Sequence, residues 1–371
     1  MTAVKEREVT YVEKDAKPPL VISDNPTEHT TYNKKDEFWR YLPTKVFDGF
    51  AKAAPAAGQP EITANNAAVA HSITTGGISG LRVRDVVTAT AVAAEHHQFV
   101  VTVDKSANGK LVELDLATAA ESNVTIELNV QEQVETRIVL RDKCKANAAT
   151  SVSVNIAKGA IVKFVMLTEE TAEGIHYGHI SVNVGRDASL TFGVISLGGG
   201  IVRRSIDSLF TDTSGEMILL GATHSANGQY CEHRTVVDHN MPNCRSYVDF
   251  RSAVDGEGTH SVWVGDTIIR YNATGSDTYE TNRNLVLSQG ARADSVPNLE
   301  IETGEVVGAG HASATGRLDD EHLFYLTSRG MTSQEALRLI VVGFFNNIVE
   351  RMGVPEIVED VVATIEKKLV S

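Results

Sequence analysis

The feature that most constrains this fold is a series of short alternating strands at a regular spacing. Hydrophobic and polar residues alternate in VTIELNV, VSVNI and ISVNV, which begin at equal intervals, at Val124, Val152 and Ile180. Alternation with a period of two is typical of strands with one buried face. A second short strand lies in each period, in RIVL, IVKF and SLTFGV. A fixed period that holds more than one strand indicates a solenoid with one coil per repeat.

The sequence therefore predicts a mainly β fold, a right-handed parallel β-helix with helical segments at the N- and C-termini. Turn residues, among them Gly159 and Asp187, precede two of the second strands. Helical stretches do not separate the strands, which argues against a doubly wound α/β sheet. A β-sandwich remains the alternative on pattern alone. We expect an N-terminal arm and mixed segment in 1–95, the β-helix core in 96–318 and a C-terminal helical domain in 319–371.

The N-terminal residues, 1 to about 35, are polar and contain three prolines, which predicts a loose arm. The stretch DEFWRYLP follows and brings Phe38, Trp39 and Tyr41 close together. Buried aromatic side chains mostly serve packing. We therefore expect this stretch to anchor the arm on the rest of the protein.

The C-terminal part carries helix signals. LDDEHLFYLTSR has Asp319 and Asp320 as candidate N-caps and is followed by Gly330. Thr332 and Glu335 then have the spacing of a capping box, and residues 333–352 show a wide apolar face. A further helix is expected from Pro355. These helices suit either a cap on the open end of a solenoid or a docking element for a partner.

The composition excludes some functions. A formal net charge of −14 disfavours nucleic-acid binding, because phosphate contacts need Lys and Arg. Three cysteines do not make a disulfide framework. No apolar run reaches the roughly 18 residues of a membrane span, and the first residues lack an apolar signal core. The sequence predicts a cytoplasmic protein without membrane partners.

Two groups of polar residues invite other interpretations. Cys231, His233, His239 and Cys244 are zinc-type ligands, but their spacing is poor, so we expect ordinary strand and turn residues. The acidic stretches SDTYETN and EIETGE suit a β-helix carbohydrate-active enzyme, which is the alternative function. In the second stretch Leu299 and Ile301 alternate with Glu300 and Glu302, which favours a solvated strand face.

A single histidine stands out in GAGHASATG, where His311 has only small neighbours. Small side chains around a histidine allow either a close approach of two backbones or access of another molecule to the ring. One protein ligand is too few to hold a metal. If His311 is functional, another chain must complete its site.

The C-terminal sequence resembles the SufD family of iron–sulfur cluster assembly scaffold subunits. The resemblance rests on HASATGRLDDEHLFYLTSRGM, with a His, a Gly, a Leu-Asp pair, Phe-Tyr-Leu and Ser-Arg-Gly in order. The segment around His239 and Pro242 is also similar, as are NLVLS and PNLEIE. The likeness is close over residues 230–350 and looser over the solenoid and at Trp39 and Arg40.

The resemblance implies a non-catalytic scaffold with two partners. A SufB-like paralogue would pair through the β-helix, and a SufC-like ABC-type ATPase would dock on the C-terminal helices, with residues 333–352 transmitting its cycle. His311 would be a transient ligand of iron or of a nascent cluster at the interface with the paralogue; no tightly bound cofactor is expected. The residues expected to bind partners are Phe324, Tyr325, Arg329, Leu337, Ile340, Phe344 and Phe345.

Two departures from the family pattern bear on this expectation. Many relatives carry a Cys shortly before the His, whereas Gly308, Ala309 and Gly310 stand there in this chain. The paralogue usually has a Glu directly after its His, where this chain has Ala312, which favours SufD over SufB. This chain is therefore expected to offer one ligand. A β-helix whose helices merely cover its end is the plainest alternative.

Overall fold

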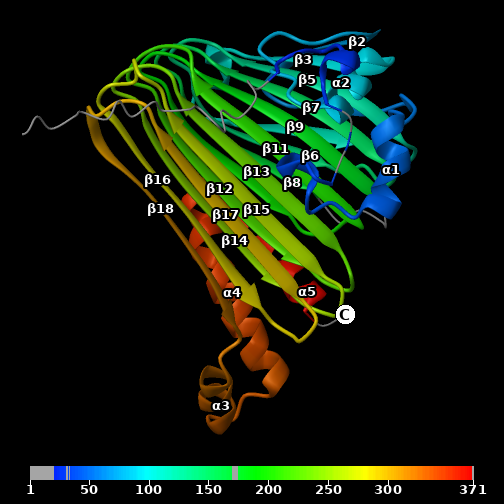
Figure 1. Cartoon of the computed structure of the whole chain (residues 1–371), viewed down its shortest axis with the longest axis vertical. Coiled ribbons are helices and arrows are strands. Elements are labelled where there is room, and N and C mark those ends of the chain that lie inside the picture. Colours follow the sequence, from blue (N-terminus) through cyan, green and yellow to red (C-terminus); the bar gives the residue numbers. More distant parts are fainter. Residues whose placement is uncertain (1–20, 31, 33, 169–173, 370–371) are drawn as a thin grey trace, which may run out of the picture.

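The fold is a two-sheet solenoid. The computed structural model describes residues 21–30, 32, 34–168 and 174–369 (Figure 1). From β3 onward, strands alternate between two sheets, and each pairs in parallel with the strand two places along the chain. The result is a β-solenoid of about eight turns. This confirms the mainly β, parallel β-helix prediction and excludes a sandwich, whose sheets are antiparallel.

Each sheet has nine strands among the described residues. Sheet A contains, in spatial order, β1 (Glu61–Ala64), β4 (Leu111–Ala117), β6 (Glu135–Asp142), β8 (Ile161–Thr168), β10 (Ser189–Ser196), β12 (Glu216–Ser225), β14 (Arg245–Val254), β16 (Ser276–Val286) and β18 (Val306–Arg317). Sheet B contains β17 (Arg292–Ile301), β15 (His260–Ile269), β13 (Tyr230–His239), β11 (Ile201–Phe210), β9 (Ile175–Val184), β7 (Ala148–Ile156), β5 (Ser122–Val130), β3 (His96–Val103) and β2 (Ala68–Thr74). The first strand of each, β1 and β2, pairs antiparallel.

The α-helices lie before β3 and after β18. The α-helices are α1 (Thr44–Lys52), α2 (Val86–Ala93), α3 (Asp320–Ser328), α4 (Ser333–Arg351) and α5 (Val358–Lys368), and the short 3-10 helices are η1 (Pro26–Glu28), η2 (Glu37–Trp39), η3 (Lys105–Ala107) and η4 (Pro355–Ile357). The predicted caps are present. Asp319 caps α3, and Thr332 and Glu335 form the capping box of α4. The backbone of Gly330, between them, has a left-handed φ of 96°.

The repeat length is not fixed, which corrects the constant spacing read from the strand starts. Val152 pairs with Ile180, as equal intervals predict, but Val124 pairs with Thr150 and not with Val152. Near the end of the solenoid the step is longer, because His260 of β15 pairs with Arg292 of β17. The turns between strands differ in length, so the strands stay paired in register although the number of residues per repeat changes.

Register stacks equivalent side chains into columns inside the solenoid. One column on sheet A follows the strand pairs from β4 to β18 and contains Val112, Ile138, Phe164, Phe192, Leu219, Val248, Glu280 and His311. Its first six members are buried in the main hydrophobic core. The last two, on β16 and β18, are polar. The interior therefore changes character where the solenoid ends.

Helices α4 and α5 cover the outer face of sheet A (Figure 1). Val341 and Phe345 of α4 and Ile365 of α5 pack with Val165 and Ile195 of sheet A in one buried cluster. Polar contacts hold the same helix against the sheet. Arg351 of α4 lies 2.9 Å from the buried carboxylate of Asp249 on β14, and Arg251 donates a hydrogen bond to the carbonyl of Phe344. The helices therefore do not cap the open end, as one interpretation of the sequence allowed.

The N-terminal segment anchors on the outer face of sheet B. Trp39 is buried, and the guanidinium of Arg203 lies 4.3 Å from the ring centre of Phe38 and 4.6 Å from that of Trp39. The same arginine donates a hydrogen bond to the carbonyl of Phe38. This confirms DEFWRYLP as a packing anchor. Residues 1–20 of the expected arm lie outside the described residues.

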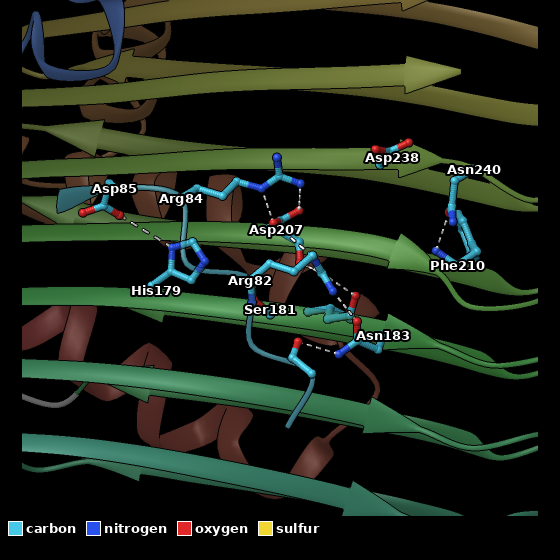
Figure 2. A network of polar contacts seen from close by, with 12 residues as sticks. Arg82, Arg84, Asp85, His179, Ser181, Asn183, Asp207, Phe210, Asp238 and Asn240 are labelled. Atoms are coloured by element: carbon cyan, nitrogen blue, oxygen red, sulfur yellow. Dashed lines mark hydrogen bonds and ion pairs between the residues drawn. The ribbon is translucent and has the colours of Figure 1, made fainter. Parts of the chain in front are cut away.

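Polar contacts from residues 82–85 continue this attachment across sheet B (Figure 2). Arg82 and Arg84 both pair with the buried carboxylate of Asp207 on β11. The backbone N–H of Arg82 also donates to Ser181 on β9. Asp85 caps α2 and accepts a hydrogen bond from the buried hydroxyl of Tyr177. Each outer face of the solenoid thus carries a covering segment, held by both apolar and charged contacts.

Burial distinguishes two aromatic residues of the C-terminal region. Phe345 is 1% exposed and Phe324 is 74% exposed. Phe345→Ala should lower the free energy of unfolding by about 3–5 kcal/mol, because it opens a cavity between helix and sheet. Phe324→Ala, the matched control, should change it by less than about 0.5 kcal/mol. Denaturant unfolding of both variants measures the difference; equal effects would contradict the placement of α4.

Candidate functional site

The candidate site lies at the open end of the solenoid, on its last strand. In the described part of the chain, β18 pairs with β16 along one edge and with no strand along the other. His311 lies near the middle of β18, opposite Glu280 of β16, at the end of the interior column. Its side chain is 42% exposed. The fold thus places one imidazole where the interior meets solvent.

The small neighbours of His311 have a partial structural explanation. Along β18, Gly308, Gly310, Ala312, Ala314 and Gly316 alternate with the interior positions and so face outward. Tyr279 of β16 pairs with Gly310, and a Cβ at Gly310 would lie 3.1 Å from the tyrosine ring. Close packing accounts for this one glycine. At Gly316 no described residue lies within 4 Å of where a Cβ would be, so packing against the described part of the chain does not require this glycine.

Glu280 lies directly beneath His311 and is 1% exposed. Its Oε2 accepts a hydrogen bond of 3.0 Å from the hydroxyl of Thr267 on β15. Its Oε1 is buried, has no hydrogen-bond partner and lies 3.8 Å from Nδ1 of His311. Burial raises the pKa of this carboxyl to about 7, and the Thr267 hydroxyl opposes the shift. The pair joins a buried acid to an accessible base.

Sheet B leaves room for this carboxylate. A Cβ at Gly265 on β15 would lie 2.4 Å from the Trp263 ring and 2.8 Å from Oε2 of Glu280. Real side chains do not pack so closely. The glycine therefore lets Glu280 reach across the interior to Thr267 beside a buried indole.

The expected partner-binding residues fall into two groups. On α3, which projects away from the sheets in Figure 1, Phe324 and Tyr325 are 74% and 53% exposed, and Arg329 lies over the Tyr325 ring. On α4 the side chains are less accessible. Leu337, Ile340 and Phe344 are half-buried, and Phe345 belongs to the helix–sheet core. Phe345 is 1% exposed, so its side chain is not accessible to a partner in this structure.

The four zinc-type residues do not gather around one point. Cys231 and His233 meet, as expected for neighbours two apart on a strand, with 3.9 Å between Sγ and Nδ1. His239 instead contacts the Ser246 hydroxyl, and the Cys244 thiol donates to the carbonyl of Asp212. Among the described residues, no three His, Cys, Asp or Glu side chains form a metal-binding group.

The glutamates of the two acidic stretches differ in their exposure to solvent. Glu300 and Glu302 are exposed at the end of β17, as expected for a solvated face. Glu280, within SDTYETN, is instead buried under His311, and local sequence patterns do not connect the two. Their pairing follows from the register of β16 and β18, where the step between turns is longer than in the early part of the solenoid.

Comparison with known proteins decides the family. A family model described as "SUF system FeS cluster assembly, SufBD core domain" matches residues 119–344. An iron–sulfur cluster assembly SufBD family protein of Mycobacterium bovis is 38% identical over 358 residues, which cover 90% of this chain and 88% of that protein. The chain belongs to the SufBD family.

More distant relatives of this SufBD protein carry the SufD name. The iron–sulfur cluster assembly protein SufD of Escherichia coli is 27% identical over 69% of this chain and 58% of its own length. SufD of Bacillus subtilis is 29% identical over 51% of this chain and 49% of its own length.

Among the described residues, no helix has both the length and the apolar character needed to cross a membrane.

The buried carboxyl predicts a pH-dependent stability in the metal-free chain. The folded-state pKa of Glu280, about 7, lies above the ordinary value of 4.5, so the folded protein holds this proton more tightly. The stabilisation is complete below pH 4.5 and is lost as pH rises through 7. Across this window the wild type should lose about 3 kcal/mol relative to Glu280→Gln. Unfolding curves at several pH values measure it; parallel pH profiles would contradict it.

Proposed function

We propose that this SufBD protein is a non-catalytic, cytoplasmic scaffold subunit of a Suf-type complex that assembles iron–sulfur clusters. It pairs with a SufB-like paralogue and docks a SufC-like ATPase, which supplies the ATP hydrolysis. The observation that carries the proposal is the open last turn with His311 at its end, in a chain of this family. The carbohydrate-active alternative has no support in the comparisons.

The open edge favours a second solenoid as the partner there. β18 is a twelve-residue strand whose outer edge has unpaired backbone groups within the described chain. Long unprotected edges of this kind promote pairing with another chain. Val307 and Ile301, near the ends of β18 and β17, are exposed apolar residues that a partner would cover. The SufB-like subunit would continue the sheets and bring its own side chains to His311.

Iron or a nascent cluster would be cargo at this interface. Imidazole is a suitable ligand for iron, and cluster sites are built mainly from thiolates. All three cysteines of this chain are buried. A thiolate at the interface must therefore come from the partner, and His311 would contribute the imidazole from this side.

The exposed face of α3 is the proposed docking surface for the ATPase. Phe324 and Tyr325 give it two accessible aromatic rings, and large aromatic side chains often dominate interface energies. α4 follows α3 and is held to sheet A by Arg351 and Arg251. A displacement of α3 during ATP hydrolysis would reach the sheet through α4. The ATPase cycle would then bias the arrangement of the two scaffold subunits.

A charge on the α3 face should disrupt docking without unfolding the chain. Phe324→Asp should weaken binding of the SufC-like ATPase by about thirty-fold or more, because it places a carboxylate in an apolar contact. Tyr271→Asp, at another strongly exposed aromatic, is the matched control and should leave affinity unchanged. Calorimetry measures both. Undiminished binding by Phe324→Asp would rule out this surface.

Loss of the imidazole should abolish cluster formation but not assembly. In the complex reconstituted anaerobically with iron and sulfide, His311→Gln should form few or no clusters by visible absorption, while the complex keeps its mass. His71→Gln, at an exposed histidine on β2, is the control and should form clusters normally. Full cluster formation by His311→Gln would reject the ligand role.

A further inference from the structure

The residue beneath His311 has a position that packing alone does not explain. At the six preceding positions of the interior column the side chains are apolar and buried. Glu280 breaks this series immediately before the histidine. A buried polar oxygen normally has a partner. Oε2 of Glu280 has Thr267, whereas Oε1 has none and faces the imidazole.

The geometry distinguishes the two nitrogens of the ring. The atom of His311 nearest the carboxylate is Nδ1, at 3.8 Å from Oε1. Hydrogen bonds of this kind are about 2.7–3.2 Å long, so a movement of the ring by about 1 Å closes the contact. The side chain is 42% exposed, so packing encloses only part of the ring. With Nδ1 turned inward, Nε2 is left to face the open end.

Burial also helps to decide whether the carboxylate orients the imidazole or acts as a second metal ligand. Oε1 of Glu280 is not reached by solvent, although His311 directly above it is partly exposed. A cation arriving from the open end therefore meets the imidazole before it meets the carboxylate. Metal-bound histidines commonly donate their other ring N–H to a carboxylate, which fixes the ring and its tautomer. The arrangement suits an orienting group better than a second ligand.

We propose that Glu280 is a positioning residue for His311, whose free carboxylate oxygen holds Nδ1 inward and leaves Nε2 as the atom that meets iron. The proposal rests on the proposed function for the identity of the cargo. The orientation itself is a property of this chain alone. Glu280 acts through the histidine and does not contact the iron. The hydroxyl of Thr267 and the gap at Gly265 hold the carboxylate in place.

The experiment measures the tautomer of His311 in the full, metal-free chain. Nitrogen NMR of the histidine-labelled protein, recorded at alkaline pH, reports which ring nitrogen carries the proton. The signal missing in His311→Gln identifies the residue. We expect Nδ1–H in the wild type, because the hydrogen bond of one nitrogen sets the tautomer. In Glu280→Met, which keeps the volume but removes the acceptor, we expect Nε2–H.

Two outcomes overturn the proposal. The wild type alone does so if His311 is in the Nε2–H form, even if Glu280→Met fails to fold. An Nδ1–H tautomer that persists in a folded Glu280→Met also does so. Glu300→Met is the matched control, because it makes the same change at an exposed glutamate of β17 and should leave the His311 tautomer unchanged.

A second readout links the orientation to iron. In the complex with the paralogue, Glu280→Met should weaken Fe²⁺ binding about ten- to a hundred-fold, the usual effect of losing such a partner. Unchanged Fe²⁺ affinity would overturn the positioning role in that complex. The tautomer needs neither iron nor partner, so it separates the two proposals. Normal cluster formation by His311→Gln alongside an Nδ1–H wild type would reject the proposed function and support the orientation.

Discussion

The parallel pairing of strands in register is the constraint on which the rest of this structure depends. Main-chain hydrogen bonds fix each strand against the strand one turn earlier, so side chains at equivalent positions stack in columns. In the column that ends at His311, six apolar residues build the core before Glu280. The same pairing that buries Val248 therefore places a carboxylate and then an imidazole at the open end. The site is the continuation of the core to the point where the core stops.

The covering segments leave this end and α3 accessible. Arg203, Asp207 and Trp39 fasten the N-terminal segment to sheet B, while Phe345 and Arg351 fasten α4 to sheet A. These contacts are largely buried, so we expect the N-terminal segment and α4 to move together with the sheets as one rigid body. Phe324 and Tyr325 on α3 and the free edge of β18 stay exposed. The proposed scaffold role uses these two surfaces for two partners, joined by α4 and the sheet.

Local patterns in the sequence were sufficient for the elements and insufficient for their relative placement. Alternation predicted β5, β7 and β9, and the Thr332–Glu335 spacing predicted the start of α4, because strand faces and helix caps depend on neighbouring residues. Which side of α4 is buried, and so whether Phe345 is accessible, depends on sheet A, whose strands are distant in the sequence. The pairing of Glu280 with His311 depends on loops of unequal length, since the step between turns is longer in the last turns than in the first. A fixed repeat therefore misses the contact that defines the site.

The central claim is that a second solenoid completes the open end next to His311. Hydrogen exchange of the backbone amides, with and without a SufB-like paralogue, tests it most directly. In a parallel ladder, alternate amides of β18 point to the free edge and have no partner within the described chain. We expect the paralogue to slow exchange of these edge amides in β17 and β18 and to leave exchange in α3 unchanged. Slower exchange elsewhere, with β17 and β18 unaffected, would contradict it.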